Sequence, residues 1–135
     1  MIAHFHKDTR RSMRGVAAEK RGRLAELLCV IVLRLTGWRV VARRVKAGRG
    51  TGLGEIDIVA RRGTVIAFIE VKARADITTA AESVTAAQRQ RIARNAEAYL
   101  RQHASLENCD IRFDVMVLGA GLFPRRIIDA WRPQH

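Results

Sequence analysis

The sequence has few residues that form cross-links or bind transition metals. It contains two cysteines in 135 residues, and Cys29 and Cys109 lie outside any CxxC or Cys/His spacing. Cys29 falls within an apolar helical pattern, which favours a buried, reduced thiol over a disulfide or a metal ligand. The four histidines show no ligand spacing either. These shortages argue against a disulfide scaffold and against a zinc site, and they indicate a reducing environment.

Long apolar runs are also missing. The longest uninterrupted run covers residues 27–33, whereas a membrane-spanning helix needs roughly 20 apolar residues. The N-terminus carries charges but no apolar segment that leads to a small-residue cleavage site, so no signal peptide is predicted. We therefore expect a cytoplasmic protein that does not enter a membrane.

Acidic residues are outnumbered by basic ones. There are 13 Asp and Glu against 25 Lys and Arg, which gives a formal net charge of +12. An excess of this size repels itself unless a partner of opposite charge offsets it. Nucleic acid, most simply DNA, is the first expected partner, ahead of an anionic membrane surface and an acidic protein. Residues 1–14 are polar and basic and indicate either a flexible arm or a poorly chosen start site, whereas residues 15–135 are predicted to form one domain.

Hydrophobic periodicity predicts a helix, three strands, a second helix and two strands. The expected helices cover residues 16–35 and 82–103, and the expected strands cover residues 38–45, 55–61, 64–73, 111–118 and 126–131. The glycine-rich stretch 46–54 lacks a phosphate-binding pattern and a following helix, so it is interpreted as a flexible hairpin connection. The second helix is long enough for a parallel crossover. The order therefore predicts an α/β sandwich with a mixed sheet flanked by helices.

Ionisable residues occur in two strands that should be buried. Side chains alternate along a strand, so Glu70 and Lys72 are expected on one face. In the preceding strand Glu55 and Asp57 are expected to share a face, with Ile56 and Ile58 opposite. Pairing of the two strands through a turn at residues 62–63 would place Asp57 opposite residue 69 or 70.

Asp57 and Glu70 could then share a metal ion. Two carboxylates, waters and a phosphate are ligands that Mg²⁺ accepts, with Mn²⁺ as an alternative. The metal would activate a bound water, and Lys72 would add positive charge beside that water or the scissile phosphate. The competing interpretation is a structural ion-pair cluster, since burying an unpaired charge is costly.

These residues carry a resemblance to a known superfamily. The blocks Gly54-Glu55-Ile56-Asp57 and Ile69-Glu70-Val71-Lys72 resemble the PD-(D/E)xK pattern of restriction-endonuclease-like nucleases, without its usual proline. Over roughly residues 20–118 the chain resembles more closely the YraN family of small bacterial proteins. That likeness rests on Gly22-x-x-Ala25-Glu26, GEIDIVA, FIEVKAR, Ala96-x-x-Tyr99-Leu100 and Arg112-Phe113-Asp114-Val115. The resemblance implies a restriction-endonuclease-like three-layer sandwich.

The resemblance also implies a site. Glu26 matches the helix-borne carboxylate that helps to hold the metal in archaeal Holliday-junction resolvases, so Glu26, Asp57, Glu70 and Lys72 become the candidate catalytic set. The first three of these are the candidate metal ligands. Gln88 stands where the family usually has lysine, which leaves a phosphate contact from this position open.

Three arginine and glutamine positions are candidate nucleic-acid contacts. Arg74 continues the face of Glu70 and Lys72, Arg49 lies in the glycine-rich stretch, and Gln88 lies in the second helix. Asp114 is expected to be structural, because an aspartate within a strand can cap a neighbouring backbone group. Trp38 and Trp131 are expected to pack in the core or at its edge rather than to stack on bases.

Three hypotheses on function follow. The first is a Mg²⁺-dependent endonuclease that hydrolyses phosphodiester bonds in DNA, including branched or structured DNA. A resolvase acts on two strands symmetrically, so that activity would call for a homodimer. The second is a non-catalytic nucleic-acid-binding module, and the third is an interaction subunit of a DNA repair or uptake assembly.

Overall fold

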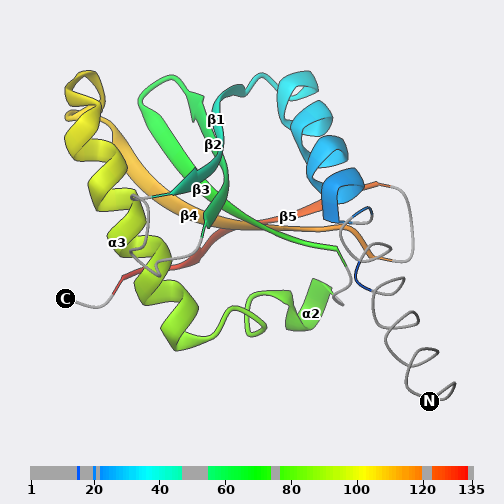
Figure 1. The fold of residues 1–135 in the computed structure, drawn as a ribbon. Helices are drawn as coiled ribbons and strands as arrows, with labels where there is room; N and C mark the ends of the chain where they lie inside the picture. Colours follow the sequence, from blue (N-terminus) through cyan, green and yellow to red (C-terminus); the bar gives the residue numbers. More distant parts are fainter. Residues whose placement is uncertain are drawn as a thin grey trace, which may run out of the picture.

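A five-stranded mixed sheet forms the middle layer of the molecule. The computed structural model describes residues 15, 20, 22–46, 55–73, 77–119 and 123–133. The strands are β1 (Arg39–Lys46), β2 (Glu55–Arg62), β3 (Val65–Lys72), β4 (Asp110–Val117) and β5 (Arg125–Trp131). A helix described over residues 22–35, here called the N-terminal helix, lies on one side of the sheet and α3 (Ala86–Gln102) on the other (Figure 1). The predicted sandwich of restriction-endonuclease-like type is therefore confirmed.

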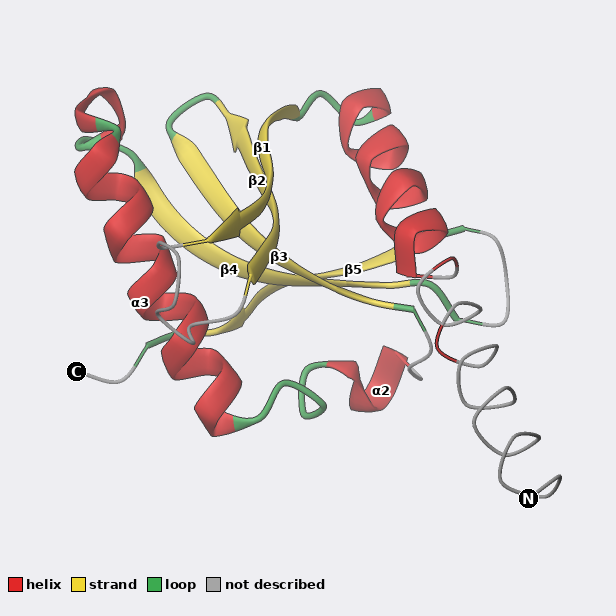
Figure 2. Cartoon of the chain, viewed as in Figure 1, coloured by secondary structure: helices red, strands yellow, loops and turns green. Residues whose placement is uncertain are grey.

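The strands follow one another in chain order across the sheet, β1-β2-β3-β4-β5. β1, β2 and β3 pair antiparallel, β3 and β4 pair parallel, and β4 and β5 pair antiparallel. The segment between the two parallel strands contains α3, which confirms the expected crossover (Figure 2). The turn between β2 and β3 begins one residue later than expected. Arg62 still pairs with Val65, and Gly63 occupies the first turn position with φ of 59°, as short hairpin turns require.

Two apolar clusters pack on opposite faces of the sheet. β3 contributes to both, because Ile66 and Phe68 belong to the cluster that includes α3, whereas Ala67 and Ile69 belong to the cluster of the N-terminal helix. All four side chains are at most 1% exposed, as expected for a central strand. Trp38 and Trp131 are buried in these two clusters, so the prediction that they pack in the core or at its edge is confirmed.

The N-terminal helix buries a different face from the one its leucines suggest. The helical spacing of the apolar residues correctly predicted a helix, yet Leu24, Leu27, Ile31 and Leu35 are 44–81% exposed. The buried face carries Ala25, Glu26, Cys29, Val30 and Leu33 instead. The helix ends as expected near Gly37, whose φ of 91° allows Trp38 N–H to donate to Leu33 O at 2.9 Å.

The helix α3 begins four residues later than expected. Thr85 is extended, and its side chain accepts a hydrogen bond from Gln88 N–H while the Gln88 side chain accepts one from Thr85 N–H. This capping box fixes the first helical residue at Ala86. A short helix α2 (Ile77–Ala80) and a 3₁₀ helix η1 (Ala104–Leu106) were not predicted, because each is too short to show a period.

Part of the chain lies outside the described residues. This holds for the expected basic arm at residues 1–14 and for most of the glycine-rich stretch, residues 47–54. Within the described ranges, no helix is long and apolar enough to cross a membrane.

Candidate active site and metal centre

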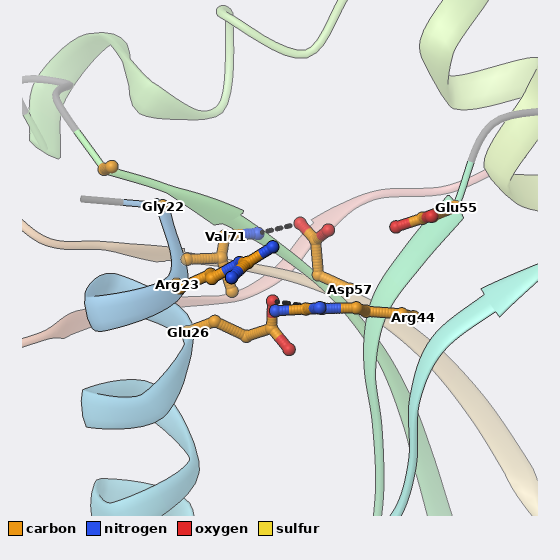
Figure 3. Close-up of a pocket in the computed structure, with 8 residues that line it drawn as sticks. Gly22, Arg23, Glu26, Arg44, Glu55, Asp57 and Val71 are labelled. Carbon is orange, nitrogen blue, oxygen red and sulfur yellow. Dashed lines mark hydrogen bonds and ion pairs between the residues drawn. The ribbon is translucent and has the colours of Figure 1, made fainter. Parts of the chain in front are cut away.

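The candidate site lies where pairing between β2 and β3 stops. The ladder runs from Arg62↔Val65 to Ile58↔Ile69, and the same register extended by one residue sets Asp57 against Glu70. The next N–H along β3, that of Val71, donates to the Asp57 carboxylate at 2.8 Å instead of to a β2 carbonyl (Figure 3). The expected opposition of Asp57 to residue 69 or 70 is thus confirmed.

The carboxyl groups of Asp57 and Glu70 form a hydrogen-bonded pair. Burial, the charge of Asp57 and this bond raise the pKa of Glu70 to about 8, while Lys72 acts in the opposite direction. Burial also raises the pKa of Asp57, against the bonds from Val71 and Glu70, which lower it. Burial thus favours the protonated form of both carboxyl groups.

Lys72 supplies the nearest positive charge to the pair on β3. Its Nζ lies 3.8 Å from Glu70 Oε1, and its side chain is 22% exposed. The shared face of Glu70 and Lys72 is as predicted. One ammonium group beside two carboxyl groups leaves the cluster with an excess of negative charge when both carboxyl groups are ionised.

A cavity of about 340 Å³ opens beside Asp57. It lies between the N-terminal helix and the adjoining ends of β1, β2 and β3 (Figure 3). The charged residues of its lining are Arg23, Glu26, Arg44, Glu55 and Asp57. Carboxylates and guanidinium groups thus face one open space, which suits a ligand that carries phosphate together with a cation.

Glu26 lies on this cavity but is held by arginines. Its side chain is 10% exposed, Arg43 donates to Oε1 from Nε at 3.0 Å, and Arg44 Nε lies 3.4 Å from Oε2. Glu26 is buried, as are Val30 and Leu33 on the same face of the N-terminal helix. In the described residues no three His, Cys, Asp or Glu side chains gather closely enough to hold a metal, so Glu26 does not join Asp57 and Glu70 directly. Its role as a metal ligand stays a prediction.

Side-chain alternation fails locally in β1 and β2. Arg43 and Arg44 are consecutive, yet both contact Glu26, because Arg44 has a left-handed φ of 52°. In the paired segment of β2, Ile56 packs with the α3 cluster and Ile58 with the N-terminal helix. The expectation that Ile56 and Ile58 share a face was therefore wrong, since it assumed regular strands. The same assumption concealed Arg43 and Arg44 as site residues, and only the pair of adjacent arginines in a strand hinted at them.

The candidate nucleic-acid contacts have different outcomes. Arg49 and Arg74 lie outside the described residues. Gln88 lies at the start of α3, where its Oε1 caps the helix, so this residue has a structural role. A phosphate contact from Gln88 stays a prediction.

Asp114 shows what a structural carboxylate looks like in this fold. It is fully buried, accepts two hydrogen bonds each from Arg112 and Arg126, and accepts a fifth from the N–H of Asp129, whose φ is 53°. The two guanidinium groups also lie over the ring of Trp38, 5.2 and 4.3 Å from its centroid. The predicted backbone-capping role is confirmed. Asp114 has two cations for one charge, whereas Asp57 and Glu70 have one cation for two carboxyl groups.

The donor set of the paired site suits a hard divalent cation. Asp57 and Glu70 offer carboxylate oxygens, which Mg²⁺ and Mn²⁺ prefer. Burial of two adjacent carboxyl groups favours added positive charge beside them, and a bound divalent ion would supply it. The residues present therefore fit such an ion.

The fold and the carboxyl pair define a small α/β protein of restriction-endonuclease-like architecture with a candidate metal site at the end of its β2–β3 ladder. A model of the uncharacterised protein family UPF0102 matches residues 25–118, and the chain belongs to this family. It is 49% identical over 116 residues to a UPF0102 protein of Paramagnetospirillum magneticum, covering 86% of this chain and 90% of the relative. It is 45% identical over 119 residues to one of Parvibaculum lavamentivorans, covering 88% and 86%.

Proposed function

We propose that this protein is a metal-dependent endonuclease that hydrolyses phosphodiester bonds in DNA, including branched or structured DNA. The observation that carries the proposal is the Asp57–Glu70 pair, two largely buried and hydrogen-bonded carboxyl groups beside a single lysine. A buried carboxyl pair without enough cations costs stability. Such a cost is typical of functional sites, where strongly shifted pKa values gather.

The residues have distinct roles in this proposal. Asp57 and Glu70 hold Mg²⁺ or Mn²⁺, and Glu26 joins them once it is released from its arginines. When bound, the metal supplies an activated water and stabilises negative charge on the phosphate. Lys72 orients the Glu70 carboxylate and places an ammonium group beside the reacting phosphate. The formal charge of +12 favours a polyanionic substrate.

A cleavage assay on linear, flap and four-way-junction DNA with Mg²⁺ or Mn²⁺ tests the proposal. We expect Lys72→Ala and Glu70→Gln each to lower the cleavage rate by about a hundredfold or more, since each removes an electrostatic contact made in the transition state. Glu97→Gln is the matched control, because Glu97 is exposed on α3. Cleavage that survives in Lys72→Ala would contradict the assignment.

The non-catalytic alternative has one observation in its favour. Both oxygens of Glu26 are engaged by Arg43 and Arg44, so the third carboxylate is not available as it stands. Binding of DNA by wild type without cleavage of any of the three substrates would favour a binding module or a subunit of a repair or uptake assembly. Sedimentation of the protein with a four-way junction tests the expected homodimer.

A further inference from the structure

Arg44 lines the cavity and has no role in the proposed nuclease chemistry. It lies in the lining with Asp57 and Glu55, and its side chain is 45% exposed. Its φ of 52° is rare for a residue with a long side chain and costs free energy. Strain of this kind persists only where the surrounding structure enforces it, and it gathers at functional sites.

The two arginines bound to Glu26 contribute unequally. Arg43 approaches Oε1 with both Nε and a terminal nitrogen at 3.0 Å, whereas Arg44 approaches Oε2 with Nε alone at 3.4 Å. Among the described residues, Arg44 lines the cavity and Arg43 does not (Figure 3). Arg43 therefore makes the closer contact with Glu26, and the Arg44 guanidinium is the more weakly held of the two.

The other carboxylate at the cavity mouth also has its own cation. Lys46 Nζ lies 3.2 Å from Glu55 Oε1, and Lys46 is not part of the described lining. Glu26 and Glu55 are thus each neutralised by a cation outside the cavity. Arg23 and Arg44 remain as the guanidinium groups that face the open space, together with the Asp57 carboxyl group (Figure 3).

We propose that this cavity is a phosphate-binding subsite in which Arg44, assisted by Arg23, binds a backbone phosphate of the nucleic acid next to the bond that is cut. The proposal rests on the proposed function for the identity of its ligand. The guanidinium fork matches two phosphate oxygens, which a lysine ammonium does not. When Arg44 moves to the phosphate, one oxygen of Glu26 is released toward Asp57, which couples substrate binding to assembly of the carboxylate site.

Binding of a DNA duplex in the presence of EDTA, measured by fluorescence anisotropy over a series of salt concentrations, tests the subsite. Arg44→Asn removes the guanidinium and keeps a residue that accepts a left-handed φ. We expect about tenfold weaker binding, the effect of one charge-assisted hydrogen bond. The negative slope of log affinity against log salt concentration should become less steep by about 0.9, the value for one phosphate contact. Arg94→Asn, exposed on α3, removes the same charge on the opposite side of the sheet and should change neither quantity by as much.

Two further measurements separate this subsite from the nuclease proposal. Inorganic phosphate should shift the Nε–H nuclear magnetic resonance signal of Arg44 in a saturable way in wild type. Arg44→Lys keeps the positive charge, so it should retain the wild-type salt slope. It should nevertheless bind the duplex almost as weakly as Arg44→Asn, because a lysine ammonium does not match two phosphate oxygens. Equal effects of Arg44→Asn and Arg94→Asn, or an unresponsive Arg44 signal, would overturn the subsite even if the wild type cleaves DNA. A responsive signal without cleavage would keep the subsite and refute the nuclease.

Discussion

Asp57 and Asp114 lie in strands on either side of β3 and are both largely buried, but their surroundings differ. Asp114 accepts hydrogen bonds from two arginines and a backbone N–H. Asp57 accepts from Val71 N–H and faces a second carboxyl group. The first arrangement stabilises the fold, whereas the second leaves a group that a cation would stabilise.

We expect Asp114→Ala to destabilise the protein by about 3–5 kcal/mol, the usual cost of removing one partner from a buried ion pair. The substitution leaves Arg112, Arg126 and the Asp129 N–H without their acceptor, and burial already lowers the pKa of Arg126. Chemical denaturation measures the change. Asp110→Ala, at an exposed position of the same strand, should stay within about 0.5 kcal/mol of wild type.

The Asp57–Glu70 pair gives the metal-free protein a distinct pH dependence. The folded state raises the pKa of Glu70 from 4.5 to about 8, so between these values the folded chain binds more protons than the unfolded chain. The contribution of Glu70 to stability is therefore full below pH 4.5 and is lost as the pH rises through 8. The raised pKa of Asp57 acts in the same direction.

Denaturation of the metal-free protein across this pH range, with Glu70→Gln as the comparison, measures the effect. The loss of stability should be smaller in the variant, and the affinity of wild type for Mg²⁺ should rise over the same interval because the metal displaces the proton. A free energy of unfolding that rises with pH in wild type relative to Glu70→Gln would contradict the raised pKa of Glu70.

Among the helices and strands, the features that could be predicted from the sequence are those that follow from regular strand and helix geometry. The opposition of Asp57 and Glu70 follows from strand register, and the crossover follows from the length of the second helix. The partners of Glu26 could not be predicted, because they depend on the φ of Arg44, which sterics alone disfavour. The buried face of the N-terminal helix was also hidden, since Leu27 and Ile31 are as apolar as the residues that pack.

The cap of α3 provides a test at this scale. Thr85→Ala removes the side-chain acceptor of Gln88 N–H and should cost about 1 kcal/mol in the free energy of unfolding. Thr85→Ser keeps a hydroxyl group in the same place and should preserve most of the stability. A similar loss in both variants would show that packing of the threonine methyl group, rather than the cap, stabilises this end of α3.

For the whole molecule, the excess of positive charge acts on stability as well as on binding. A formal charge of +12 repels itself within the folded chain, and added salt screens this repulsion. We expect the free energy of unfolding to rise from low to moderate NaCl concentration, while affinity for DNA falls over the same range. Denaturation curves at several salt concentrations measure the first effect. A fall in stability would instead mean that ion pairs such as those of Asp114 dominate.

The bond from Val71 N–H to Asp57 makes the carboxylate part of the sheet itself. Lys72 O accepts a hydrogen bond from Leu118 N–H, so the backbone groups of Lys72 point toward β4. Because backbone groups alternate along a strand, the Val71 N–H points toward β2. There the Asp57 side chain takes the place of a main-chain acceptor. The end of the ladder and the chemistry of the site are therefore encoded by the same side chain. A lineage that lost Asp57 to an apolar residue would disturb its strand pairing as well as its chemistry. An asparagine in its place retains an acceptor oxygen, so it would keep the strand pairing while removing the carboxylate of the candidate site.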